Sequence, residues 1–342
     1  WRLLAVATAA LGLALATLRG DLLGAWEGRL WLWRVSARCA LQAPWLGHGT
    51  GSFPFVYLEE QGALLAPLPL DEAAVRFVNA TSAHNDWLQL WSDGGLIAPV
   101  LLAAALGLAI WDNRRRWPGA AAAVLVVAVS ALGDAPLTLP AVMMMLAPAL
   151  ASGTTLPPRR LDAALAFTVL AAAALLLPRG TSDWLAERRL TRARELLPAE
   201  RLQLLSRAAA AAPHHGDASL ALGLALLEGG QPDRALPQLS RSRAQLANAS
   251  TAVAIGNAHA AAGRPAEAIA HYQAALRLHP ASLSAQVNLA EALRRTGRLD
   301  QATTHLDAAR ELWPHHPLIL QLAEQLRRAR NDEGDGQPPP SP

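Results

Sequence analysis

The chain alternates between long apolar and long polar stretches before it becomes charged and helical in character. A helix needs about 20 apolar residues to cross roughly 30 Å of hydrocarbon, and five segments with almost no charge approach that length. These candidate spans are residues 1–18, 96–111, 118–132, 136–152 and 161–177. The third and fourth are short and rich in Ala or Pro, so they also fit a hairpin. The pattern predicts an all-α chain whose first half is a polytopic membrane part.

Arginine placement predicts how these spans are oriented, because positive residues in short loops stay on the cytoplasmic side. The arginines at 114–116 mark one such loop, and those at 159–160 mark another. With alternating spans, the polar stretch 19–95 and everything after Pro178 lie on the periplasmic face of an inner membrane. The chain also begins at Trp1 inside an apolar run, so we expect further spans to precede it.

A repeat begins after residue 178, where the composition changes to charged segments rich in Ala and Leu. Three kinds of residue recur at a spacing of 34 residues: small residues, a bulky Tyr or Leu, and Pro. This spacing is the tetratricopeptide period. The matched pairs are Gly263 and Gly297, Ala268 and Ala302, Tyr272 and Leu306, Ala275 and Ala309, and Pro280 and Pro314. A weaker unit precedes them, with Gly230 and Ala235 in register. We therefore expect three helical pairs over 214–314 and a capping helix over 318–328, stacked as an α-solenoid.

These patterns divide the chain into six expected regions. They are a transmembrane helix (1–18), a periplasmic reactive loop (19–95), further transmembrane helices (96–178), a helical connector (179–213), tetratricopeptide repeats with their capping helix (214–330), and a tail (331–342). The tail has no apolar residue and is rich in Pro and acids, which is typical of disorder.

Composition agrees with a membrane protein and excludes one class of partner. The 342 residues are 52% hydrophobic, with a mean hydropathy of +0.19. The net charge of +3 is carried by Arg alone, since the chain has no Lys. This charge is too small and too scattered to indicate a nucleic-acid partner. The single cysteine, Cys39, excludes an internal disulfide.

One titratable motif, Ala83-His84-Asn85-Asp86, ends the polar loop just before the apolar run at 96–111. Ionisable groups are costly in lipid, so a catalyst acting on a lipid-anchored substrate should keep them at the water boundary. A neutral imidazole there can take the proton of a hydroxyl. The alternative is a capping or interfacial His. Asn85 and Asp86 are candidate substrate-binding residues, but capping of the helix that begins near Trp87 explains them better.

Arginines and aromatic residues share the segment 28–34, which leads into an amphipathic helix ending near Pro44. A guanidinium fork matches a diphosphate, although Trp and Arg at an interface also anchor in lipid headgroups. Arg29 is the first candidate phosphate ligand. Arg34 and Arg38 follow at helical spacing and fit phosphate contact or solvated positions equally well. No acidic cluster with metal-binding spacing accompanies them, so we expect no metal and no other cofactor.

The joint pattern of these motifs resembles the bacterial O-antigen ligase family. The residues that carry the resemblance are Gly28, Arg29, Trp33, Pro44, Leu46, Gly47, Gly49, Gly51, Phe53, His84, Asn85, Asp86, Leu88, Gln89, Gly95 and Leu96, followed by Asp134, Ala135, Pro136, Leu137 and Pro140. The resemblance covers about residues 20–150. His48 departs from the small or apolar residue expected in the Gly-rich turn of residues 47–53 and is assigned a structural role. Members with appended tetratricopeptide repeats are similar in overall plan.

The resemblance implies a metal-independent inner-membrane glycosyltransferase of the GT-C kind. Its donor would be a polyprenyl-diphosphate-linked glycan, and its acceptor the lipid A core, another glycan or a protein hydroxyl. It assigns the base to His84 and the diphosphate contact to Arg29. Direct attack by the acceptor hydroxyl would invert the anomeric centre. The repeats would then offer a concave surface to a protein partner or acceptor.

Two other functions remain open. A non-enzymatic scaffold would use the spans as an anchor and the repeats to recruit envelope proteins, and it should tolerate His84→Ala. A transporter is disfavoured because no charged residue lies in the middle of a span, apart from Asp134 if the hairpin turn is counted. The His pairs 214–215 and 315–316 follow repeat-ending prolines without ligand partners, so we expect turn residues there and not a metal site.

Overall fold

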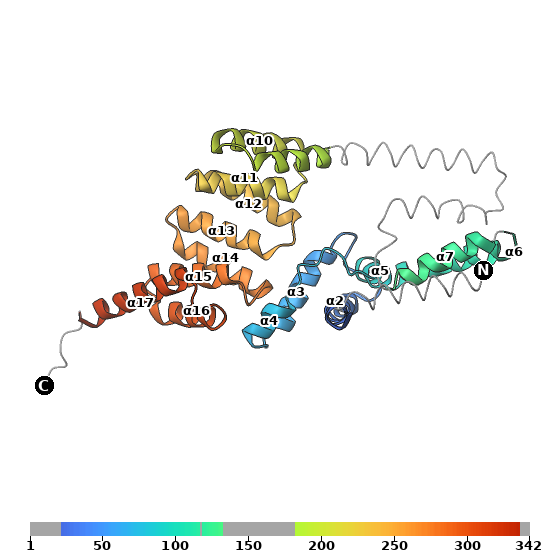
Figure 1. Cartoon of the computed structure of the whole chain (residues 1–342), viewed down its shortest axis with the longest axis horizontal. Helices are drawn as coiled ribbons and strands as arrows, with labels where there is room; N and C mark the ends of the chain where they lie inside the picture. The colour runs from blue at the N-terminus through green and yellow to red at the C-terminus, as the bar shows by residue number, and fades with distance from the viewer. Residues whose placement is uncertain (1–21, 117, 133–181, 336–342) are drawn as a thin grey trace. The chain divides into compact units, whose positions relative to one another are not determined.

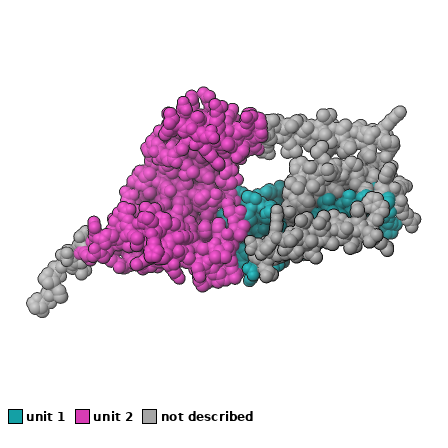
Figure 2. Space-filling model, viewed as in Figure 1, with its two compact units in different colours: residues 1–60, 80–154 teal, residues 61–79, 155–342 magenta. Residues whose placement is uncertain are grey.

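A computed structural model describes residues 22–116, 118–132 and 182–335, and every regular element in these ranges is an α-helix (Figure 1). The predicted all-α class is therefore confirmed for this part of the chain. Two compact units are distinguished in Figure 2, one of residues 1–60 and 80–154, the other of residues 61–79 and 155–342.

The first unit is built around a short helix that packs on two longer ones. Its described helices are α2 (Leu22–Gln42), the start of α3 (Phe53–Leu65), α5 (Asp86–Gly94), α6 (Ile97–Arg116) and α7 (Pro118–Ser130). Helix α5 packs on α2 and leads into α6, which packs along α7. Leu106, Ala109 and Val124 are buried between α6 and α7, and Trp87 of α5 packs against them. This core fixes the start of α5, where the candidate base lies.

The predicted spans fall only partly on described helices. Residues 96–111 supply most of α6 and residues 118–132 supply α7. The other three, 1–18, 136–152 and 161–177, lie outside the described residues. Among the helices that the structure describes, none combines the length and the apolar character needed to cross a membrane.

The second unit is a stack of antiparallel helices. Its described helices are α4 (Leu70–Arg76), a helix over 182–193, α10 (Pro198–Ala211), α11 (Gly216–Glu228), α12 (Pro232–Gln245), α13 (Ala249–Ala261), α14 (Pro265–Leu278), α15 (Leu283–Arg295), α16 (Leu299–Leu312) and α17 (Pro317–Asp335). Successive helices pack on each other along the stack. The three predicted pairs, α11 with α12, α13 with α14 and α15 with α16, are confirmed.

Two of the pairs close because a glycine of the first helix faces a large residue of the second helix. A Cβ added at Gly256 would lie 2.5 Å from the ring of Tyr272, and one added at Gly223 would lie 2.5 Å from the Leu239 side chain. The two helices therefore approach too closely for any larger residue at either glycine. Tyr272 is fully buried, and its hydroxyl donates to Asn257 Oδ1 at 2.8 Å. This packing explains why small and large positions alternate in the repeat.

Glycine is also required in the turn between the two helices of each pair. Gly230, Gly263 and Gly297 have φ angles of 68°, 76° and 76°. This left-handed conformation strains residues that carry a Cβ. The recurrence of glycine at these three positions is therefore a consequence of the turn that they form.

Both ends of the solenoid extend beyond the predicted repeats. The helix over 182–193 and α10 lie in the expected connector, yet Ala193 and Leu205 are buried in one core with residues of α11 and α12. The tail prediction was wrong for its first five residues, because α17 continues to Asp335. No Pro occurs in this helix after its first residue, and the next Pro is Pro338, so Gly334 alone did not end it. The rest of the tail lies outside the described residues.

Candidate functional site

Helix α2 carries the three candidate phosphate ligands, and its geometry separates them. Arg29, Arg34 and Arg38 are all exposed. Residues four apart share a helix face, whereas residues nine apart point in opposite directions at about 100° per residue. Arg34 and Arg38 therefore lie on one face of α2, and Arg29 emerges from the other side about two turns earlier.

Arg38 is held by a buried carboxylate. Its Nε lies 2.5 Å from Glu60 Oε1, and Gln42 Nε2 donates to Glu60 Oε2 at 2.5 Å. The side chain of Glu60 is only 10% exposed, while that of Arg38 is 54% exposed. One edge of the guanidinium is thus fixed by Glu60 from α3, and the rest of the group faces solvent. This arrangement orients a cation toward a ligand from outside the helix pair.

The Gly-rich turn after α2 clamps the far end of α5. The backbone N–H groups of His48 and Gly49 donate to the carbonyls of Ser92 and Asp93, each at 2.9 Å. A Cβ added at Gly47, whose φ is 68°, would lie 2.4 Å from the Asp93 backbone. The glycines therefore allow backbone to pack on backbone. In the described residues, these glycines do not form a phosphate-binding loop.

His48 has a structural environment, as the sequence predicts. Its Nε2 lies 2.8 Å from the carbonyl oxygen of Cys39 and so ties the turn to the end of α2. Cys39 itself is buried. Burial, assisted by the nearby Glu60 carboxylate, raises the pKa of the Cys39 thiol to about 12. The thiol is therefore protonated and unreactive at neutral pH.

His84 has the most unusual backbone in the candidate site. Its φ of 46° makes it the one residue other than glycine with a positive φ in the described ranges. Its neighbours fix this conformation: the N–H of Ala83 donates to Gln89 Oε1 at 2.9 Å, and the N–H of Asp86 donates to the Ala131 carbonyl at 2.9 Å. The His84 side chain is exposed. A strained residue held from both sides and presented to solvent is typical of a functional site.

Asn85 and Asp86 are placed differently from His84. Asn85 is 7% exposed and Asp86 is 3% exposed. Asn85 is the N-cap of α5, with Oδ1 accepting from the Leu88 N–H at 3.0 Å, and its Nδ2 donates to the Leu132 carbonyl at 2.8 Å. The capping interpretation of Asn85 is confirmed. Both residues join α5 to the end of α7, and their role as direct substrate contacts stays a prediction.

The structure joins some of the candidate residues and separates others. His84 precedes the first turn of α5, whereas the Gly-rich turn contacts its last turn, and a helix of nine residues is about 13 Å long. Sequence analysis missed Glu60, which holds Arg38 and stands in no motif that would single it out. Gln89 belongs to the motif quoted for the resemblance, but its bond to the Ala83 N–H was not predicted.

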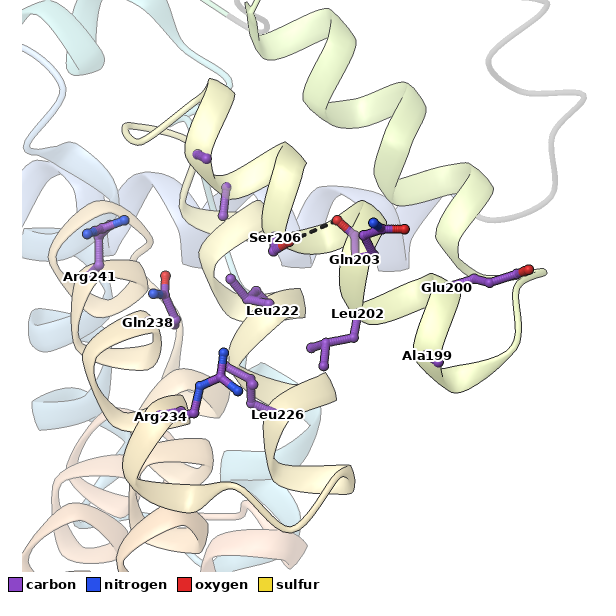
Figure 3. A pocket seen from close by; sticks show the side chains of 12 residues that line it. Ala199, Glu200, Leu202, Gln203, Ser206, Leu222, Leu226, Arg234, Gln238 and Arg241 are labelled. Atoms are coloured by element: carbon purple, nitrogen blue, oxygen red, sulfur yellow. Dashed lines mark hydrogen bonds between the residues drawn. The ribbon is translucent and has the colours of Figure 1, made fainter.

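A second candidate surface is a groove of about 680 Å³ in the repeat region. Figure 3 shows Leu222 and Leu226 of α11 between side chains of α10 and α12. Arg234, Gln238 and Arg241 of α12 face the groove from one side, and Leu202, Gln203 and Ser206 of α10 line the other. An apolar floor with polar walls is suited to a peptide or a protein surface.

The His pairs behave as turn residues. His215 caps α11, where its Nδ1 accepts from the Ala218 N–H at 3.3 Å, and His214 Nε2 lies 2.8 Å from Asp183 Oδ1. In the described ranges, no group of three or more His, Cys, Asp or Glu side chains is arranged to hold a metal ion.

Comparisons with known proteins agree with two parts of this organisation. A model of the O-antigen ligase family matches residues 2–103, which include the Gly-rich turn and the candidate residues of α2 and α5. A tetratricopeptide repeat model matches residues 202–250 and 253–317. No curated protein matches the chain.

Solved structures resemble the chain only weakly. A structure described as "MamA MSR-1 C2" is 28% identical over 34% of this chain and 67% of its own, with a TM-score of 0.32. The tetratricopeptide protein YrrB is 22% identical over 64% of this chain and 98% of its own, with a TM-score of 0.35. The Cut9-Hcn1 structure is 15% identical over 82% of this chain and 57% of its own, with a TM-score of 0.38. The chain thus combines a segment similar to the O-antigen ligase family with tetratricopeptide repeats.

Proposed function

We propose that this protein transfers a glycan from a polyprenyl-diphosphate carrier to an acceptor hydroxyl at the periplasmic face of the bacterial inner membrane. The acceptor is the lipid A core, another glycan or a protein. The O-antigen ligase match supports the reaction class, because it includes Arg29, the Gly-rich turn and His84. The apolar segments and the arginines that flank them support the membrane location and its orientation.

The observation that carries the proposal is the conformation of His84. A φ of 46° at a residue with a Cβ is unfavourable, and Ala83, Asn85 and Asp86 on either side are tied by hydrogen bonds. A His that only lies at the membrane interface does not need a strained backbone with fixed neighbours. A general base benefits from one, because a fixed backbone limits where its imidazole can reach.

In the proposed reaction, His84 takes the proton of the acceptor hydroxyl as the hydroxyl oxygen attacks the anomeric carbon of the donor sugar. The new bond joins that oxygen to the anomeric carbon, and the bond from the anomeric carbon to the diphosphate oxygen breaks. The polyprenyl diphosphate leaves with the bonding electron pair. Attack from the side opposite the leaving group inverts the configuration.

Arginines stabilise the leaving diphosphate in this proposal, because negative charge accumulates on it in the transition state. Arg34 and Arg38 share a face of α2, and Glu60 holds one edge of Arg38. Arg29 lies on the other side of the helix, so one diphosphate in contact with all three would have to wrap around α2. We therefore propose that Arg29 contacts the diphosphate and that Arg34 and Arg38 contact the donor at its sugar.

The proposal is tested by glycan and glycoprotein profiling of cells that lack the full-length gene. The cells are complemented with wild type, with His84→Ala, or with His315→Ala, an exposed histidine of the repeats, at equal membrane abundance. We expect wild type and His315→Ala to restore a product that His84→Ala does not restore, and the product identifies the acceptor. Full restoration by His84→Ala would overturn the assignment of the base.

A scaffold function is the second candidate, and the repeats favour it because tetratricopeptide stacks commonly bind proteins. The groove between α10, α11 and α12 gives such a partner a defined surface. In a scaffold, substitutions at exposed residues of that groove, such as Arg241→Glu, should abolish function while His84→Ala has no effect. In the transferase, groove substitutions should affect only reactions whose acceptor or partner is a protein.

A further inference from the structure

Residues 61–79 belong to the same compact unit as the tetratricopeptide repeats, although they lie within the loop between α2 and α5. This segment comprises the last turns of α3, helix α4 and the strand-like residues that follow. Helix α4 contacts α16 of the repeats. In Figure 1, α4 lies beside the stack at α16. The segment is therefore a candidate ligand of the repeats.

An aromatic stack forms the centre of this contact. The rings of Phe77 and His279 are 3.6 Å apart between centroids and 5° from parallel. His279 ends α14 as its C-cap. Burial lowers the pKa of His279 to about 4, so the ring is neutral at pH 7 and stacks on the phenyl ring without an exposed charge.

A glycine permits the close approach of α3. Gly62 is buried, and a Cβ added there would lie 2.1 Å from the carbonyl oxygen of Arg277, at the end of α14. Glycine within a helix is unfavourable relative to Ala. Its presence at position 62 is explained by this contact with the repeats, because no side chain fits between the two backbones.

The segment is organised to present Phe77. Gln61 binds both backbone groups of Val78: its Nε2 donates to the Val78 carbonyl at 3.0 Å, and its Oε1 accepts from the Val78 N–H at 2.9 Å. Gln61 is itself fully buried. These two bonds close the chain from α3 through α4 into a loop and fix the residue next to Phe77. The side chain of Phe77 is thus positioned before it meets His279.

We propose that the end of α14, together with α16, forms a docking surface for residues 61–79 of the same chain, anchored by Phe77 on His279. Helix α3 is continuous from Phe53 to Leu65, so the docked segment begins within this helix, at Gln61. The docking does not rest on the proposed transferase function.

Disulfide trapping in the full-length membrane protein tests the docking. Phe77→Cys combined with His279→Cys places two thiols where the rings stack. The matched control is Val75→Cys with His279→Cys, because Val75 is 86% exposed. Native Cys39 is buried and stays in both proteins. Under mild oxidation we expect at least a tenfold larger cross-linked fraction, measured by mass spectrometry of the joined peptides, for the 77/279 pair. Equal or absent cross-linking in the two proteins would overturn the proposal.

Limited trypsin digestion of the intact protein provides a second readout that needs no cross-link. The Arg76–Phe77 bond should be protected in wild type, and Phe77→Ala should increase its cleavage rate about tenfold while Val75→Ala leaves it unchanged. Unprotected wild-type protein would contradict the docking. If cross-linking and protection occur but the wild-type protein shows no glycan transfer, the docking stands and the transferase function fails. If transfer occurs without either, the docking fails alone.

Discussion

The side-chain amide of Asn85 donates to the main-chain carbonyl of Leu132 at 2.8 Å and joins the residue after His84 to the end of α7. The same side chain caps α5 through its oxygen. One residue thus fixes both the start of the helix and its position against a second helix. His84, which precedes it, is consequently presented in a strained conformation by groups that need no contact with substrate.

Asn85→Asp tests this positioning role. The substitution keeps the capping oxygen but replaces the donor to Leu132 with a second acceptor, in a site that is 7% exposed. We expect a lower Tm and a transfer rate reduced about tenfold, with kcat affected more than KM, because the His84 backbone loses one of its supports. The control is Asn79→Asp, at an exposed position. An unchanged kcat in Asn85→Asp would contradict the role.

The pair of Arg38 and Glu60 makes a prediction that separates stability from substrate binding. Arg38→Ala leaves the buried Glu60 carboxylate without its cation and should destabilise the fold by about 1–3 kcal/mol, less than a fully buried pair because Arg38 is half exposed. The double variant Arg38→Met with Glu60→Leu should recover most of this stability in thermal unfolding. Both variants lack the Arg38 guanidinium, so both should have a raised KM for the donor. A wild-type KM in the double variant would show that Arg38 does not contact the donor.

The fold of the repeats could be predicted largely from sequence, whereas the support of the site could not. The 34-residue spacing of Gly263 and Gly297 is a local signal, since each turn demands a left-handed residue. The helix over 182–193 and α10 lack this signal, because residues 194–197 between them contain no glycine, and they were therefore assigned to a connector. Their place in the stack depends on tertiary packing of Leu205 and its neighbours.

The same distinction applies within the candidate site. The motif around His84 is contiguous, so its residues could be identified from sequence, and the capping of α5 by Asn85 followed from its position. The pairing of Glu60 with Arg38 joins two helices across the Gly-rich turn, and no spacing rule connects them. Backbone strain at His84 also has no sequence signature, because His is not a residue that a left-handed position demands.

Because the repeats are closely packed, adding one methyl group between two of their helices should lower their stability markedly. Gly256→Ala places a Cβ against the buried ring of Tyr272 and should destabilise the repeat region by about 1–3 kcal/mol. This corresponds to a Tm lower by roughly 2–4 °C per kcal/mol for a unit of this size. Gln273→Ala, at an exposed position of α14, is the control and should leave the Tm unchanged. A wild-type Tm for Gly256→Ala would mean that α13 and α14 are farther apart.

Acid should release residues 61–79 from the repeats. The folded-state pKa of His279, about 4, lies below its ordinary value of 6.5, because burial disfavours the charged ring. The docked state is therefore fully stable above about pH 6.5 and loses stability as the pH falls toward 4. Hydrogen exchange of residues 70–78, corrected for intrinsic rates, should increase between pH 7.5 and pH 5. His279→Phe keeps the stack without the titration, and its exchange should not respond to pH in this way.

Burial of Cys39 predicts the reactivity of the only thiol. With a pKa of about 12 and no exposed surface, the thiol should not react with iodoacetamide at pH 8 in the folded protein. Labelling should begin only when α2 separates from α3, so its rate reports on that opening. Stoichiometric labelling of the native protein within minutes would contradict the packing described for α2.

The central claim is that His84 is the general base of a glycan transfer, and a transfer assay with the purified full-length protein tests it most directly. The assay measures glycan transferred and polyprenyl diphosphate released for wild type, His84→Gln and His315→Ala. We expect a loss of about 10²–10⁴-fold in kcat for His84→Gln, with unchanged thermal stability and full activity in His315→Ala. A His84→Gln enzyme that keeps the wild-type kcat would contradict it.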